Sequence, residues 1–183
     1  MTDKVVSIII PVYNVAGYLD ECLASLVVQS YRDIEIICVN DGSTDGSDAI
    51  LKQWAERDSR IKLLSQSNKG LSAARNAALD VALGEYVAFV DADDRVEKEM
   101  FPHLMERVSK YDLDAVGCCY KTFPDGNRSR FSFRTGEVLD FPAMLGSSKR
   151  YQSSNDLCLC WRYIFRKEIL SLDLDFHLFY GYA

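Results

Sequence analysis

The sequence lacks several features that would place a protein in a broad class. No apolar run is long enough to span a membrane, and the N-terminal MTDKVVSIII is too short in apolar residues, with no cleavage site, to be a signal peptide. The patterns GxGxxG and GxxxxGK[ST] are absent, which argues against a dinucleotide-dependent oxidoreductase and a P-loop NTPase. Only two histidines occur, and no serine–histidine–aspartate set is evident. We therefore expect a cytosolic protein whose function does not depend on a dinucleotide cofactor, a P-loop or a serine–histidine–aspartate triad.

The chain also lacks an excess of basic residues and a recognisable pairing of its cysteines. The 183 residues carry a net charge of −6, which argues against a nucleic-acid binder, and their 48% hydrophobic and 26% charged content is ordinary for a globular protein. The six cysteines match no common zinc spacing. Cys22 and Cys38 lie in apolar patterns typical of a core. A chain of this length is expected to form one domain.

Short apolar runs alternate with helical patterns along the first two thirds of the chain. Strands are predicted at residues 5–10, 34–39, 61–64, 86–90 and 114–123. Amphipathic helices are predicted between them, the second capped by Ser43 or Thr44. The buried face of the third helix is predicted to carry Leu71, Ala74, Ala78, Val81 and Ala82. This order predicts an α/β fold with a mostly parallel sheet flanked by helices.

The pattern becomes less regular after residue 123. Residues 124–127 are typical of a turn, and Phe131 and Phe133 alternate as in a hairpin arm. Residues 147–155 are polar and predicted to form a loop. Residues 161–172 are predicted to be helical.

Polar clusters begin where three of the predicted strands end. They are PVYN at 11–14, NDGS at 40–43 and DADD at 91–94. Parallel strands end at the same edge of a sheet, and open α/β sheets bind ligands in the crevice at that edge. We therefore expect the three clusters to surround one ligand site.

The side chains of these clusters have a coherent chemistry. Adjacent carboxylates repel, and Asp93, with Asp91, offers the oxygen ligands that Mg²⁺ or Mn²⁺ prefers. Asp41 can accept a hydrogen bond from an imide N–H or a ribose hydroxyl, and Tyr13 can stack on a base. Arg75, on the third helix, can reach a phosphate. A nucleoside diphosphate with a divalent cation would provide a partner for each of these side chains.

Simpler interpretations of the same residues stay open. The DADD segment can form a solvated turn, and Asp41 can serve only to shape a turn and cap a helix. Tyr13 can cover the first helix, and Arg75 can form a surface ion pair.

These motifs together resemble those of family 2 glycosyltransferases of the GT-A fold. The resemblance covers residues 5–123 and rests on VSIIIPVYN, IICVNDGSTDGS, NKGLSAARNAAL and GEYVAFVDADD in this order. It implies a Rossmann-like nucleotide-diphospho-sugar transferase that transfers a sugar from a UDP-sugar to a glycan or lipid-linked acceptor with inversion. It also implies a Mn²⁺ or Mg²⁺ cofactor, and leaves room for contact with the inner face of a membrane.

The resemblance also implies roles for individual residues. The donor-binding residues would be Pro11, Val12, Tyr13, Asn14, Asp41, Arg75, Asp91, Ala92 and Asp93. The PVYN residues would line the base pocket, and Asp41 would bind the uracil. Arg75 would face the nucleotide, Asp91 would bind the ribose, and Asp93 would hold the metal on the diphosphate.

The C-terminal region departs from the family pattern. Residues 161–170 match a WxxIFRKEIL-like helix, but the Gly-Glu-Asp motif expected to supply the general base is missing from FHLFYGYA. We therefore expect residues 1–123 to form the donor-binding half and residues 124–183 a partial acceptor-side region of the same domain. Asp156, Asp173 and Asp175 are alternative bases.

Three other functions are compatible with some of these features. A non-catalytic nucleotide-sugar-binding module would not need the general base. A nucleotidyltransferase would use the metal, but the sequence has no basic glycine-rich loop at its N-terminus to hold a triphosphate. A phospho-accepting receiver domain also gathers acids at strand ends and needs a lysine after its fifth strand, where Lys121 lies, but the PVYN and NDGS motifs disfavour it.

Overall fold

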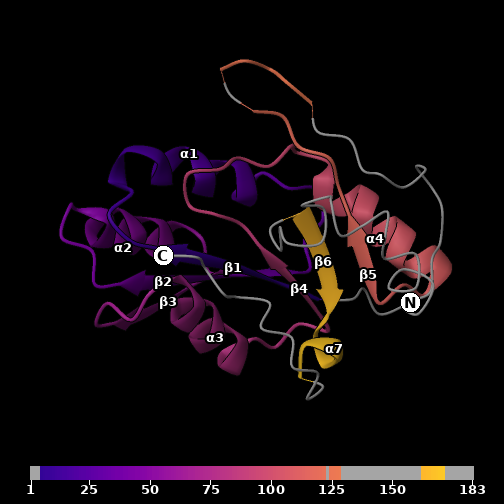
Figure 1. Ribbon diagram of the computed structural model, residues 1–183, viewed down its shortest axis with the longest axis horizontal. Coiled ribbons are helices and arrows are strands. Elements are labelled where there is room, and N and C mark those ends of the chain that lie inside the picture. Colours follow the sequence, from indigo (N-terminus) through magenta and orange to yellow (C-terminus); the bar gives the residue numbers. More distant parts are fainter. Residues whose placement is uncertain (1–4, 123, 129–161, 172–183) are drawn as a thin grey trace, which may run out of the picture.

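The computed structural model describes residues 5–122, 124–128 and 162–171 (Figure 1). Within them, helices and strands alternate from the start. The elements are β1 (Val6–Val12), α1 (Ala16–Val27), β2 (Ile34–Asp41), α2 (Ser47–Arg57), β3 (Ile61–Gln66), α3 (Leu71–Val81), β4 (Tyr86–Phe89), α4 (Met100–Tyr111), β5 (Ala115–Gly117), β6 (Tyr163–Arg166) and α7 (Lys167–Ser171). No helix in these segments combines the length and the apolar character needed to cross a bilayer.

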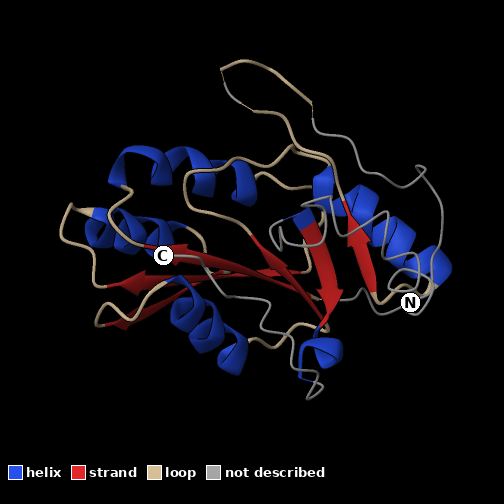
Figure 2. Ribbon diagram, viewed as in Figure 1, coloured by secondary structure: helices blue, strands red, loops and turns tan. Residues whose placement is uncertain are grey.

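The strands form one mixed sheet in the order β3-β2-β1-β4-β6-β5. The first four strands are parallel to their neighbours, whereas β6 runs antiparallel to both β4 and β5. Helices cover both faces, with α1, α2 and α4 on one side and α3 on the other (Figure 2). The predicted α/β class and mostly parallel sheet are therefore confirmed.

The alternation of side chains along β1 separates two apolar cores. Ile8 and Ile10 contribute to the core under α1, α2 and α4, whereas Ile9 contributes to the core under α3. Successive residues of a strand point to opposite faces of the sheet, so a strand covered on both faces needs to be mostly apolar. This explains the largely apolar VSIII run, in which each buried isoleucine stabilises the fold by about 2 kcal/mol and the buried Ser7 donates its hydroxyl to the carboxylate of Glu35.

The buried face of α3 differs from the predicted one. Ala74 and Ala78 are buried as expected, but Leu71 is 49% exposed and Val81 is 44% exposed. Arg75 is buried instead. Small alanine side chains bring α3 close to the sheet, and the stripe that contacts the sheet is therefore rotated toward Arg75.

The start of α2 and the region after residue 111 also differ from the prediction. Gly46, and not Ser43 or Thr44, is the N-cap of α2. Residues 163–166, predicted to be helical, form β6, while the helix α7 begins only at Lys167. The fifth strand is limited to Ala115–Gly117.

The strand β6 forms because it has partners on both sides. Its backbone pairs with β4 and β5, and these hydrogen bonds outweigh the local helical pattern. Arg166 fixes its end, since its guanidinium binds the carboxylates of Glu85, Asp112 and Asp114 at 2.8–3.1 Å.

The turn predicted at residues 124–127 is confirmed by the bridge between Lys121 and Arg128. Phe131, Phe133 and the predicted loop at 147–155 lie outside the described residues. Cys22 and Cys38 are free and buried, as predicted for core residues. Burial, and next the carboxylates of the acidic segment (residues 91–94, which include Asp91, Asp93 and Asp94), raise the pKa of the Cys22 thiol to about 12.

Candidate functional site

The predicted polar clusters meet at the carboxyl edge of the parallel strands. The strands β2, β1 and β4 are adjacent in the sheet, so their carboxyl ends lie side by side. β1 and β2 pair as far as Val12 and Asn40, but the pairing of β1 with β4 ends at Ile9 and Phe89. Pro11, which has no N–H to donate, therefore lies beyond the end of β4. The sheet edge is therefore uneven, since β1 and β2 extend further than β4. The acidic segment follows directly after the shorter strand β4.

The PVYN segment is half buried and half exposed. Pro11 and Val12 are buried within β1, whereas Tyr13 is 49% exposed at its end. Asn14 adopts a left-handed backbone with φ of 53°, which asparagine tolerates better than most residues. Its side-chain Oδ1 accepts a hydrogen bond from the Thr44 backbone N–H at 2.8 Å. This bond joins the turn after β1 to the turn after β2 and leaves Tyr13 at the surface of the edge.

Asp45 strengthens the same junction, and no sequence pattern singled it out. Its Oδ2 accepts the N–H of Ala16, the first residue of α1, at 2.8 Å. Its Oδ1 accepts the N–H and the hydroxyl of Ser47, the first residue of α2, at 3.1 and 2.6 Å. One carboxylate thus occupies the amino ends of two helices, where negative charge is favourable. The hydrogen bond from Ala16, and next that from Ser47, lowers the pKa of Asp45.

Asp41 is buried and hydrogen-bonded to the loop before α3. It is 3% exposed, and it accepts bonds from Gln66 Nε2 at 2.7 Å and from the backbone N–H groups of Lys69 and Gly70 at 2.9 Å. A carboxylate has about four lone-pair directions, so three bonds leave capacity for one further donor. Asp41 therefore shapes the edge of the crevice, and it can accept one more N–H.

Gly42 allows the two loops to approach this closely. Its φ is +77°, and an added Cβ atom would lie 2.9 Å from the backbone nitrogen of Asn68. Any side chain at this position would push the loop before α3 away from Asp41.

Arg75 and Asp91 form a partly buried ion pair. Arg75 Nη2 lies 2.7 Å from Asp91 Oδ1, with the Arg75 side chain 7% and the Asp91 side chain 31% exposed. The guanidinium carbon also lies 5.7 Å from the centre of the Phe89 ring. The sequence left a surface ion pair open for Arg75, and the pair exists, but the arginine is not at the surface. It joins α3 to the acidic segment, so two predicted donor-binding residues are held together.

The acidic segment makes a tight turn directly after β4. The Asp94 N–H donates to the Asp91 carbonyl at 2.9 Å, and Ala92 between them is buried. Asp93 is exposed and makes no hydrogen bond or ion pair with another described residue. Partial removal from water, and next the charges of Asp91 and Asp93, raise the pKa of Asp94 to about 6. The segment thus gathers negative charge at the carboxyl edge of the sheet.

This donor set fits a divalent cation that shares its ligands with a substrate. Among residues 5–122, 124–128 and 162–171, no three His, Cys, Asp or Glu side chains are arranged to hold a metal by themselves. Mg²⁺, however, usually takes one or two carboxylates together with substrate phosphates and waters. The free, exposed carboxylate of Asp93 meets that requirement.

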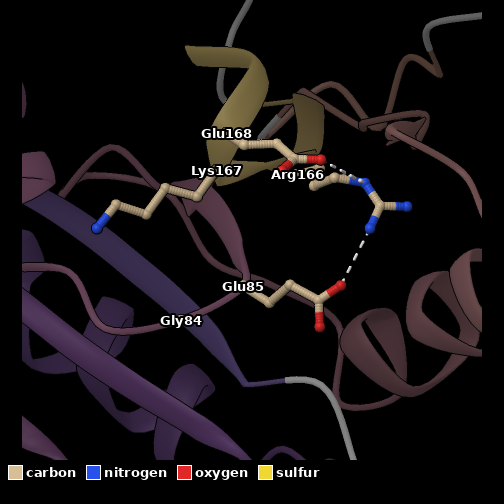
Figure 3. Close-up of a pocket in the computed structure, with 5 residues that line it drawn as sticks. All are labelled: Gly84, Glu85, Arg166, Lys167 and Glu168. Atoms are coloured by element: carbon tan, nitrogen blue, oxygen red, sulfur yellow. Dashed lines mark hydrogen bonds and ion pairs between the residues drawn. The ribbon is translucent and has the colours of Figure 1, made fainter. Parts of the chain in front are cut away.

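A groove at the opposite end of β4 lacks such chemistry. It has a volume of about 480 Å³ and is lined by Gly84, Glu85, Arg166, Lys167 and Glu168 (Figure 3). Glu85 and Glu168 both point toward the Arg166 guanidinium, at 3.1 and 3.8 Å. The Lys167 ammonium donates to the Ala82 carbonyl. Because the two carboxylates are paired with the guanidinium and the ammonium is bound to a carbonyl, the groove does not compete with the carboxyl edge as the candidate site.

Comparisons with known proteins connect this site to one family. A sequence model described as Glycosyl transferase family 2 matches residues 7–170. A Bacillus subtilis protein named uncharacterized glycosyltransferase EpsJ is 40% identical over 166 residues, which cover 90% of this chain and 48% of the relative.

Two solved structures share the fold. S. aureus TarS 1-349 in complex with UDP superimposes with a TM-score of 0.73 at 26% identity, covering 91% of this chain and 48% of that TarS 1-349 chain. The mannosyltransferase PcManGT from Pyrobaculum calidifontis, in complex with GDP-Man and Mn²⁺, gives a TM-score of 0.60 at 28% identity, covering 67% of this chain and 37% of that protein. The chain thus spans about half the length of EpsJ and of TarS 1-349, and less of PcManGT.

Proposed function

The chain belongs to glycosyl transferase family 2 and has the GT-A fold, and we propose that it forms the donor-binding part of an enzyme that transfers a sugar from a UDP-sugar. The acceptor is a glycan or a lipid-linked glycan, and the reaction inverts the anomeric centre. One observation carries the proposal. Asp41, the Arg75–Asp91 pair and Asp93 come from three segments of the chain and converge on the carboxyl edge of one parallel sheet.

The base and ribose are assigned to the inner part of this edge. Tyr13 is exposed beside Pro11 and Val12 and offers an aromatic face on which uracil can stack. Asp41 retains one acceptor position, which matches the single imide N–H of uracil. Asp91, oriented by Arg75, presents its remaining oxygen to the ribose hydroxyls. The complex of TarS with UDP supports uridine as the nucleoside.

The diphosphate is assigned to the acidic segment. Asp93 would hold Mn²⁺ or Mg²⁺ there, and the complex of PcManGT with GDP-Man and Mn²⁺ supports a divalent cation. When bound, the cation supplies positive charge against the diphosphate that departs as the leaving group. Ala92, buried beneath the turn, holds Asp91 and Asp93 at a fixed separation.

Transfer forms one bond and breaks one bond at the anomeric carbon. An acceptor hydroxyl attacks from the face opposite the diphosphate, the bond to the diphosphate oxygen breaks, and UDP departs with the electron pair. The hydroxyl proton passes to a carboxylate base. Asp156, Asp173 and Asp175 are the sequence candidates for this base, and all three lie outside the described residues.

Calorimetry of UDP binding with and without Mn²⁺ tests the proposal. We expect Mn²⁺ to tighten UDP binding in the unaltered chain and to lose that effect in Asp93→Asn. Asp80→Asn is the matched control, since it makes the same change at an exposed carboxylate on α3. An equal effect of Mn²⁺ in Asp93→Asn would contradict the metal assignment.

The choice of nucleotide and the transfer step are tested separately. A panel of UDP, GDP, CMP and dTDP identifies the base, and preference for GDP would contradict the assignment of Asp41 to uracil. Binding of a UDP-sugar without transfer to any glycan acceptor would favour a non-catalytic nucleotide-sugar-binding module.

A further inference from the structure

The segment that carries Asp93 is held by the C-terminal half of helix α1. Residues 90–99 connect β4 to α4 and contain neither helix nor strand. Side chains of α1 and of the residues just after it contact this connection at several points: Glu21 and Ser30 bind the exposed side chains of Arg95 and Glu99, whereas Cys22, Ser25 and Gln29 bind its backbone. Gln29 makes the most extensive contact. We propose that Gln29 is a positioning residue for the divalent cation, because it fixes the connection that places Asp93. This inference rests on the proposed function.

Gln29 uses both ends of its carboxamide. The residue is fully buried, with 0% exposure. Its Nε2 donates to the Ser25 carbonyl at 3.1 Å and to the Glu97 carbonyl at 2.9 Å. Its Oε1 accepts the backbone N–H of Phe101 at 3.3 Å. A fully buried amide with partners on all sides is rigidly placed, and it transmits that placement to the residues it binds.

The bond to Phe101 also caps helix α4 from a distance. Phe101 is the second residue of α4, so its N–H has no partner within the helix. The N-cap residue Glu99 makes no side-chain capping bond. Gln29 therefore supplies an acceptor that the local sequence does not. The first turn of α4 is thus stabilised by a residue that follows α1.

Two further contacts from α1 hold the middle and the start of the connection. Ser25 Oγ accepts the Val96 N–H at 3.1 Å, and the Cys22 thiol lies 3.7 Å from the Asp91 carbonyl. Cys22 and Ser25 are three residues apart and lie on one side of α1, and Gln29 follows just beyond the end of the helix. Together these three residues contact the connection near its start, in its middle and at its end.

The position of the Asp93 carboxylate depends on the backbone around it, because the side chain makes no stabilising contact with another described residue. The Asp93 side chain is also exposed. Ordering one loop residue costs about 1–2 kcal/mol of conformational entropy. With the connection already fixed by α1, a cation binding to Asp93 does not bear that cost.

The test compares Gln29→Met with Leu51→Ala. Methionine keeps the approximate volume of glutamine but leaves the Glu97 carbonyl and the Phe101 N–H without partners. Leu51 is fully buried on α2, away from the connection, so its truncation destabilises the fold without touching the acidic segment. Three quantities are measured for each variant: the Kd of UDP without metal, the Kd of Mn²⁺ in the presence of UDP, and amide hydrogen exchange at Val96 and Phe101.

We expect Gln29→Met to raise the Kd of Mn²⁺ about tenfold, as loss of supporting contacts around a metal typically does, and to leave the Kd of UDP without metal unchanged. Exchange at Val96 and Phe101 should quicken. Leu51→Ala should change neither the Mn²⁺ affinity nor the exchange at these two amides. If Gln29→Met does not fold, Ser25→Ala is the second variant. It removes the acceptor of the Val96 N–H together with the bond that the Ser25 hydroxyl donates to the Cys22 carbonyl, and it should raise the Kd of Mn²⁺ and quicken exchange at Val96 by smaller amounts.

Each contrary result has a distinct meaning. An unchanged Kd of Mn²⁺ in Gln29→Met, or an equal increase in Leu51→Ala, would overturn this inference and leave the proposed function standing. If the unaltered chain bound UDP with no dependence on Mn²⁺, the metal role in the proposed function would fail, and the role of Gln29 with it.

Discussion

Replacement of Asp41 by asparagine is a direct test of how the crevice is built. Asp41 has three hydrogen-bond donors around it, from Gln66, Lys69 and Gly70, and is 3% exposed. A carboxylate accepts all three bonds. An asparagine has one acceptor oxygen and one NH₂ donor, so in either orientation its NH₂ group faces at least one N–H.

The size of the effect follows from the better of the two orientations. If the new NH₂ group faces Gly70, one bond to a charged acceptor is lost, and the other two weaken because their acceptor is now neutral. A hydrogen bond to a charged group contributes about 1.5–3 kcal/mol, so we expect Asp41→Asn to lower the free energy of unfolding by about 3 kcal/mol. UDP binding should weaken too, because the loop before α3 moves away from the crevice.

Urea denaturation measures this change, and Asp48→Asn is the control. Asp48 accepts bonds from Asn40 and Lys52, but its side chain is 43% exposed, so the same substitution should cost about 1 kcal/mol or less. If Asp41→Asn unfolded at the same urea concentration as the unaltered chain, the three bonds would not hold the loop, and the argument for a preformed crevice would fail.

Other contacts offer independent tests. Asp45→Asn should raise the Kd of UDP severalfold, because one carboxylate oxygen that now binds the amino end of a helix becomes an NH₂ donor; an unchanged Kd in calorimetry would refute this. Burial alone would raise the pKa of Glu35, but hydrogen bonds, first that from Lys62, lower it below its usual 4.5. The stability from Glu35 is therefore fully present above pH 4.5 and lost as the pH falls through the lowered pKa, so acid denaturation should be less steep in Glu35→Gln. Arg166→Met should lower the free energy of unfolding by about 1–3 kcal/mol in urea denaturation, since four exposed carboxylates lose their partner, and no change would mean that β6 is held by its backbone alone.

The pattern of apolar residues predicted the parallel half of the sheet because that half is built from local signals. The runs that become β1, β2 and β4 are mostly apolar before their carboxyl ends, as strands covered on both faces need to be, and the polar exceptions Ser7 and Glu35 are buried and hydrogen-bonded to each other. Parallel strands end at one edge, so the positions of Asp41 and Asp93 in the sequence were enough to predict that they would lie at the same crevice.

The local pattern was wrong where distant partners decide the structure. Residues 163–166 carry a helical pattern and form a strand, because β4 and β5 offer backbone partners from far earlier in the chain. Arg75 is buried, and Leu71 and Val81 are exposed, because close packing of alanines sets how α3 is rotated against the sheet. Neither outcome has a signal in the neighbouring residues.

The structural roles of Asp45 and Gln29 were not predicted from the sequence for the same reason. Asp45 binds Ala16 across 29 positions, and Gln29 binds Phe101 across 72 positions. Asp45 lies within the NDGSTDGS motif, but neither that motif nor the stretch around Gln29 indicates which distant backbone group the side chain binds. The sequence alone therefore determined which chemical groups reach the crevice. Only the tertiary structure decided what holds them there, because that depends on contacts between segments that the chain brings together by folding.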